Sequence, residues 1–134
     1  MDIKEFLGQA LHLDSVINSE VAELDRLRKL SMKIGSSRLD ERVTHSAPNE
    51  APFAKWVESI VDKEREINEK IDKLVAVKLS ISNFIDSIDN HEWQSLLRNR
   101  YVLCMSWPNI AVAMNYSLST VQRLHKKILR NLEN

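Results

Sequence analysis

The sequence predicts an all-α protein in which two long amphipathic helices precede a module of short helices. The 134 residues contain only two Gly and three Pro, while Leu, Ile, Lys, Glu and Asp recur, a composition typical of helical proteins. In two long segments the apolar residues repeat at intervals of three and four, which places them on one helix face. The remaining C-terminal residues contain capping and turn residues at short intervals, as expected for short helices.

The first long helix is expected at residues 3–34. Glu20 and Ser31 interrupt its apolar stripe, which consists of Ile3, Phe6, Ala10, Leu13, Ile17, Leu24, Leu27 and Ile34. Gly35 follows the stripe directly and is expected to end the helix. Residues 35–52 are small, polar and flanked by Pro, and they predict a flexible linker.

The second long helix is expected from residue 53 to residue 88, in a segment that ends at residue 90. Glu64 and Lys78 break its stripe, which consists of Trp56, Ile60, Ile67, Ile71, Leu74, Ile81, Ile85 and Ile88. A helix with one narrow stripe is not stable alone, so each long helix must pack on a partner. That partner is either the other helix of the same chain or a second chain, and the length of the stripes favours self-association.

Residues 91–134 predict a module of three short helices. The first spans His91–Tyr101, and Ser106 is expected to cap the second, at residues 107–114. Pro108 fits the first turn of that second helix, because an amide hydrogen there would have no partner within the helix.

The second and third short helices form a helix-turn-helix pattern. Asn115 tolerates the left-handed backbone of a tight turn, Ala111 is small enough for the helix crossing, and Ser117 is expected to cap the last helix. That helix buries Val121, Leu124, Ile128 and Leu132, so its outward positions are Leu118, Ser119, Thr120, Gln122, Arg123 and Lys126. We expect these six residues to read DNA bases, since Gln pairs with adenine and Arg with guanine in the major groove.

The charge of the chain is divided between its two parts. Of 19 Lys/Arg and 19 Asp/Glu, residues 91–134 hold 6 and 2, which leaves 13 and 17 for residues 1–90. The C-terminal module therefore carries a positive excess suited to an anionic partner. Its expected phosphate ligands are Arg98, Arg100, Lys127 and Arg130.

The stretch that begins at Leu96 also resembles known families. It is similar to the region-4 helix-turn-helix of bacterial sigma factors, although Ile128 stands where those proteins usually have Ala. It resembles more closely the phage late-gene transcription regulators of the ArpU/RinA type. The matching positions are Arg100-Tyr101, Trp107, Ile110-Ala111, Met114, Tyr116-Ser117, Val121 and Arg123-Leu124-His125. The resemblance covers residues 67–132 and implies a DNA-binding regulator encoded by a phage or prophage.

No residue pattern predicts an enzyme, a cofactor or a metal site. His12, His45, His91 and Cys104 are too dispersed for a zinc site, and the sequence has no Gly-rich phosphate loop. The single Cys104 fits a reducing compartment. No apolar run approaches the roughly 20 residues of a membrane span. We therefore expect a protein of the bacterial host cytoplasm that does not enter the membrane.

The function expected from the sequence is sequence-specific binding of double-stranded DNA, by a transcription regulator that forms homo-oligomers through its long helices. RNA polymerase is a further candidate partner. Two alternatives remain open: a small terminase-like DNA-packaging protein, and a protein-interaction module that binds RNA polymerase or a sigma or anti-sigma factor. The target sequence, and the choice between activation and repression, stay open as well.

Overall fold

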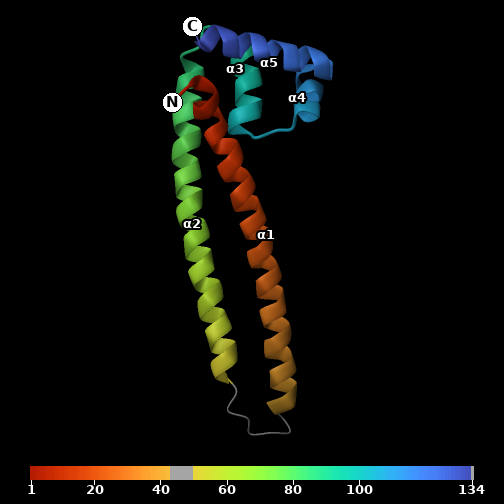
Figure 1. Cartoon of the computed structure of the whole chain (residues 1–134). Helices are drawn as coiled ribbons and strands as arrows, with labels where there is room; N and C mark the ends of the chain where they lie inside the picture. Colours follow the sequence, from red (N-terminus) through yellow and green to blue (C-terminus); the bar gives the residue numbers. More distant parts are fainter. Residues whose placement is uncertain (43–49, 134) are drawn as a thin grey trace. The chain divides into compact units, whose positions relative to one another are not determined.

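A computed structural model describes the backbone of residues 1–42 and 50–133 and the side chains of residues 1–33 and 54–133 (Figure 1). Every regular element in those ranges is a helix, which confirms the predicted all-α fold. The elements are α1 (Ile3–Arg42), α2 (Glu50–Asp86), α3 (His91–Leu97), the π-helix η1 (Arg98–Val102), α4 (Trp107–Met114) and α5 (Leu118–Glu133). None of the helices within the described ranges is long and apolar enough to span a bilayer.

Each long helix extends beyond one of its predicted limits, whereas α2 ends at Asp86, two residues before the predicted end. The prediction that Gly35 ends the first helix is wrong, because α1 continues to Arg42. A glycine ends a helix by adopting a left-handed backbone, whereas Gly35 has no positive φ and is followed by Arg, Leu and Glu, which favour a helix. The second helix begins at Glu50, and Pro52 lies in its first turn, where an amide hydrogen has no helical partner. Much of the predicted linker 35–52 is thus helical, and the rest, residues 43–49, lies outside the described residues.

The chain divides into two compact units: unit 1, Met1–Ser15 with Asp72–Asn134, and unit 2, Val16–Ile71. In unit 1 the first turns of α1 pack antiparallel against the end of α2. The rings of Phe6 and Phe84 meet edge to face at 5.7 Å, and Asp14 forms an ion pair with Lys78 at 3.5 Å. The long-helix side chains of unit 1 that are completely buried are Leu7, Ala10, Ile81 and Ile85.

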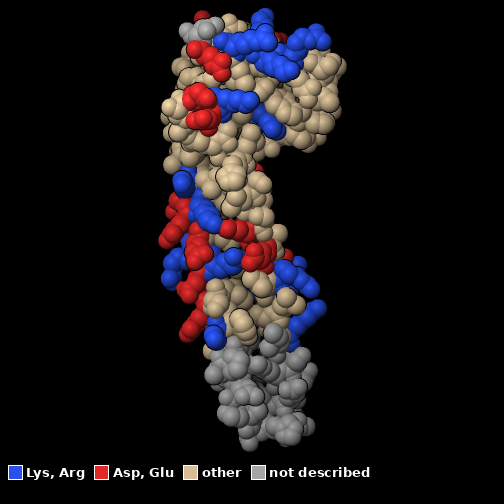
Figure 2. All heavy atoms as spheres, viewed as in Figure 1, with Lys and Arg blue, Asp and Glu red and all other residues tan. Residues whose placement is uncertain are grey.

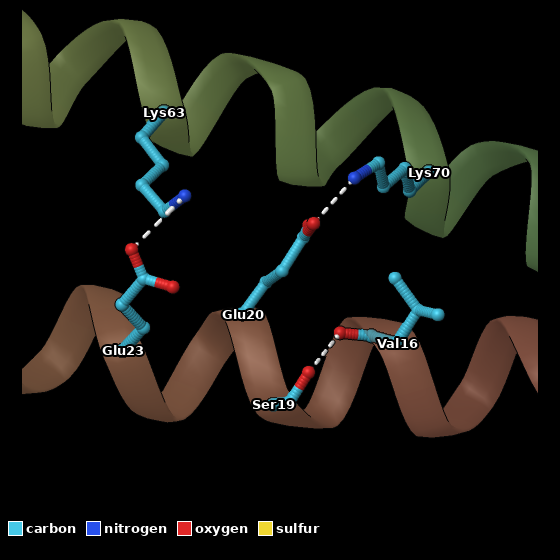
Figure 3. A network of polar contacts seen from close by, with 6 residues as sticks. All are labelled: Val16, Ser19, Glu20, Glu23, Lys63 and Lys70. Carbon is cyan, nitrogen blue, oxygen red and sulfur yellow. Dashed lines mark hydrogen bonds and ion pairs between the residues drawn. The ribbon is translucent and has the colours of Figure 1, made fainter.

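In unit 2 the same two helices pack antiparallel along a smaller core. The buried apolar side chains among its described residues are Ile17, Leu24 and Ile67. Ion pairs cross between α1 and α2: Glu20–Lys70 at 2.5 Å, Glu23–Lys63 at 3.2 Å and Arg28–Glu64 at 2.6 Å (Figure 3 shows the first two).

The charged residues that break the apolar stripes have partners on the opposite helix. Glu20 pairs with Lys70, and Glu64 pairs with Arg28, both within unit 2. Such partly exposed pairs contribute only about 0–1 kcal/mol each. They favour one alignment of the two helices, because an axial shift would separate each charge from its partner. The sequence left open whether each long helix packs on the other helix of the same chain or on a second chain. In each unit the two helices of one chain pack on each other.

Replacing Leu7 by Ala should lower the free energy of unfolding by about 2–5 kcal/mol, because Leu7 is fully buried and the substitution leaves a cavity. The matched control is Leu79→Ala in the same unit, where the side chain is 59% exposed and the loss should stay below about 0.5 kcal/mol. Urea unfolding followed by circular dichroism measures both losses. Equal losses in the two variants would contradict the packing of α1 in unit 1.

Candidate nucleic-acid interface

Both predicted helix caps are confirmed. Ser106 Oγ accepts a hydrogen bond from the Asn109 amide at 3.4 Å and begins α4. Ser117 Oγ accepts one from the Thr120 amide at 3.2 Å and begins α5. Each bond satisfies an amide that has no partner within its helix. The start of α5 is therefore determined by a residue directly before the predicted base-reading positions.

The turn between α4 and α5 has the predicted left-handed residue. Asn115 has φ 60° and ψ 38°, and it ends α4. The Tyr116 amide donates to the Ala111 carbonyl at 2.9 Å across this turn. Ala111 is buried, as expected for the small residue where two helices cross. The turn thereby brings α5 back against α4 within three residues of chain.

The two faces of α5 differ sharply in exposure. Val121 and Ile128 are completely buried, and Leu124 and Leu132 are half-buried. All of the predicted base-reading residues are exposed: Leu118, Ser119, Thr120, Gln122, Arg123 and Lys126. The outward assignments made for this helix from its periodicity are therefore correct, and of the four inward ones Val121 and Ile128 are fully buried and the other two only in part. Figure 2 shows Lys and Arg side chains gathered where Figure 1 places α5.

Two of the outward residues also contribute to the cap. Ser117 Oγ lies 2.7 Å from Thr120 Oγ1 and 3.3 Å from Ser119 Oγ, so the three hydroxyls form a small hydrogen-bonded group. Reading a base with Ser119 or Thr120 would compete with these bonds. Gln122, Arg123 and Lys126 lie beyond the cap and carry the longer polar side chains of this face.

The four predicted phosphate ligands fall into two groups. Lys127 and Arg130 are exposed on α5. Arg98 and Arg100 are instead half-buried and have internal partners, which differs from the outward-facing role expected for them. Arg98 forms an ion pair with Asp86 at 2.6 Å. Arg100 donates to the Met105 carbonyl at 2.9 Å, and its guanidinium lies 4.5 Å from the centre of the Trp107 ring.

The helix predicted at His91–Tyr101 changes its winding near its end. α3 stops at Leu97 and continues as η1, in which the Leu103 amide donates to the Arg98 carbonyl five residues earlier, at 2.9 Å. Cys104 then leaves the helix with φ 55°. The wider turn changes the direction of the side chains that follow it. π-Turns of this kind are common at functional sites. Periodicity in the sequence does not predict it.

A polar and aromatic cluster, which we call the His125 cluster, forms between α5, η1 and the start of α4. It comprises Arg100, Tyr101, Trp107 and His125. Tyr101 Oη is hydrogen-bonded to His125 Nε2 at 2.5 Å, and the Trp107 and His125 ring centres are 4.6 Å apart. Burial, helped by the charges of Arg100 and Lys4, lowers the pKa of His125 to about 4. Burial also raises the pKa of Tyr101. His125 is therefore a neutral hydrogen-bonding residue near neutral pH.

This cluster extends what the sequence indicates about these residues. His125 is half-buried and hydrogen-bonded to Tyr101. Periodicity in the sequence does not predict this partner, because Tyr101 lies 24 residues earlier in the chain. The only signal in the sequence is that Arg100, Tyr101, Trp107 and His125 all belong to the quoted regulator-like motif. Within the part of the chain that the structure describes, no group of three or more His, Cys, Asp or Glu residues is arranged to hold a metal ion.

The low pKa of His125 predicts an acid-sensitive stability. Between the ordinary histidine pKa of 6.5 and the folded value of about 4, the unfolded chain binds a proton that the folded chain does not. Stability should therefore fall as the pH decreases through this window and lose nothing from His125 above it. The variant His125→Gln should show a smaller loss between about pH 7 and about pH 4.5 than the wild type. The exposed His12→Gln is the control, and an equal loss in all three proteins would contradict the burial of His125.

The chain matches a known protein family, and the match covers the module just described. Residues 54–133 match the family described as protein of unknown function, DUF1492. The matched segment includes most of α2 and all of the short helices, and it leaves out α1. No curated protein and no solved structure matches the chain. Because the match spans more than half of its residues, the chain belongs to the DUF1492 family.

Proposed function

We propose that this protein is a sequence-specific DNA-binding transcription regulator in which α4, the turn at Asn115 and α5 act as a helix-turn-helix. The observation that carries the proposal is the division of α5 into two faces. Its inner face is anchored by the buried Val121 and Ile128, while the six outward residues from Leu118 to Lys126 are all exposed. A helix that presents its N-terminal outer face in this way fits the major groove.

The exposed side chains supply the chemistry for reading bases. Arg123 can donate two hydrogen bonds to guanine, and Gln122 can both donate to and accept from adenine. Leu118, which is 43% exposed, can contact a thymine methyl group. Ser119 and Thr120 serve mainly the cap of α5, because their hydroxyls bond to Ser117. We therefore assign most of the specificity to Gln122, Arg123 and Lys126.

The charge on the same helix supplies binding that does not depend on sequence. Lys127 and Arg130 are exposed on α5 beyond the base-reading residues and are suited to phosphates. We leave Arg98 and Arg100 out of the proposed interface, because Asp86 and Trp107 already hold their guanidinium groups. Binding through these phosphate contacts should weaken as salt increases.

The resemblance of this segment to ArpU/RinA-type regulators and to sigma-factor region 4 supports the same proposal. It also favours a phage or prophage as the source. RNA polymerase then becomes a candidate protein partner, since regulators of this kind act at promoters. A chain that contacts polymerase without binding DNA would correspond to the alternative of a protein-interaction module.

We further propose that the regulator binds as a homo-oligomer through the long helices. Helix-turn-helix proteins commonly place two recognition helices on a symmetric site, which needs two copies. The large apolar side chains that are exposed among the described residues of unit 2 are Val21, Leu30, Met32, Trp56, Val57, Val61 and Ile71. Of these, Val57, Val61 and Ile71 share one face of α2 by their spacing. A second copy packed on that face would remove these three side chains from water.

Replacing Arg123 by Ala should reduce discrimination at one base position by about 1–3 kcal/mol, because a paired hydrogen bond to guanine is lost. The matched control is Lys127→Ala, which should weaken binding to all duplexes alike and lower the salt slope by about 0.9. Fluorescence anisotropy at two salt concentrations measures both, using a duplex selected from a randomised pool and a scrambled one. If Arg123→Ala keeps the wild-type sequence preference, Arg123 is not a base reader.

Replacing Val57 and Val61 together by Ser and Asn should shift the protein from oligomer to monomer. Both side chains are exposed in unit 2, at 40% and 46%, so their replacement should leave the fold of the single chain intact. Native mass spectrometry and sedimentation give the mass, and circular dichroism gives the helix content. A wild-type monomer would contradict the oligomer, whereas a ring would favour the DNA-packaging alternative over the regulator.

A further inference from the structure

The contacts on the inner face of α5 are of two physical kinds. Val121 and Ile128 are completely buried apolar side chains. Their burial sets which face of α5 points inward, but an apolar contact does not itself require a particular direction. His125 lies between these two residues and makes a hydrogen bond, which requires both a distance and an angle.

Contacts from two neighbouring elements converge on His125. Tyr101, which is 5% exposed, approaches from η1 and shares the 2.5 Å hydrogen bond. Trp107, the first residue of α4, lies against the same imidazole at 4.6 Å between ring centres, with the rings tilted by 60°. The imidazole is thus held by one directional bond and one ring contact from different elements.

Arg100 holds the start of α4 in place. Its guanidinium lies over the Trp107 ring at 4.5 Å, and it donates to the carbonyl of Met105, the residue before the cap of α4. Arg100 thereby ties η1 to the start of α4 at two points. The two residues that contact His125 are therefore held relative to each other by a third side chain.

We propose that Arg100, Tyr101 and His125 are positioning residues that set the rotation of α5, and so determine which of its outer side chains reach the bases together. His125 is two residues after Arg123 and directly before Lys126. A rotation of α5 at His125 would turn both of these side chains by the same angle. This inference rests on the proposed function, since it concerns the orientation of a helix that reads DNA.

The test removes the directional contact and keeps the packing. Tyr101→Phe retains the ring and loses the hydroxyl, while His125→Leu retains bulk and loses the ring nitrogen that bonds to Tyr101 Oη. Each should weaken binding to the selected duplex by roughly three- to tenfold, which corresponds to one ordinary hydrogen bond. Binding to a scrambled duplex, and the salt slope, should stay unchanged. His125→Gln should restore most of the preference, because its amide can still bond to Tyr101 Oη.

A merely structural role would give a different result. If Tyr101→Phe and His125→Leu weaken binding to both duplexes equally, or only in proportion to the fraction unfolded, the inference is wrong. The combined variant should lose less than the sum of the single losses, because both changes remove the same bond. His12→Leu, at an exposed position, is the control and should bind both duplexes like the wild type.

The failure of this inference can be distinguished from the failure of the proposed function. A wild-type chain that prefers no duplex over any other contradicts the DNA-reading function. The orientation of α5 can still be measured in that event, from residual dipolar couplings of its amides in the wild type and in Tyr101→Phe. Couplings that change together along α5 support the positioning role, and identical couplings overturn it.

Discussion

The outer face of α5 depends on how its inner face is held. Val121 and Ile128 supply the buried area, while His125 supplies a contact with a defined direction. The first kind of contact provides most of the stabilisation, and the second limits the orientations that remain. A helix that reads bases needs both, because its side chains must reach groups whose positions the duplex determines. The same logic explains why a polar residue lies among apolar ones on this face.

The long helices follow a related division between stability and alignment. The buried Ile67 and Leu24 stabilise the antiparallel pairing in unit 2, and the ion pair of Glu20 with Lys70 restricts its alignment. These charges look like defects in an apolar stripe when each helix is considered alone. In the folded chain each lies opposite its partner at a partly exposed position, so the pair itself adds little net stability.

Net charge alone does not define the basic surface that an anionic partner would contact. Residues 91–134 hold six of the 19 Lys/Arg, yet two of the six, Arg98 and Arg100, are engaged within the protein. The remaining four lie on α5 and are exposed there. The basic surface is thus narrower than the composition indicates, and it coincides with the helix whose outer face is polar. This coincidence gives the DNA-binding proposal more weight than the modest charge excess.

Local sequence patterns are enough to predict the all-α fold, the caps at Ser106 and Ser117, the turn at Asn115 and the exposed face of α5. These features depend on residues within one or two helical turns of each other, so local chemistry suffices to predict them. The structure was needed to show that Arg100 turns inward and that Tyr101 bonds to His125. These contacts join the separate elements η1, α4 and α5, and packing selects them because a polar group removed from water must find a partner wherever the fold brings one.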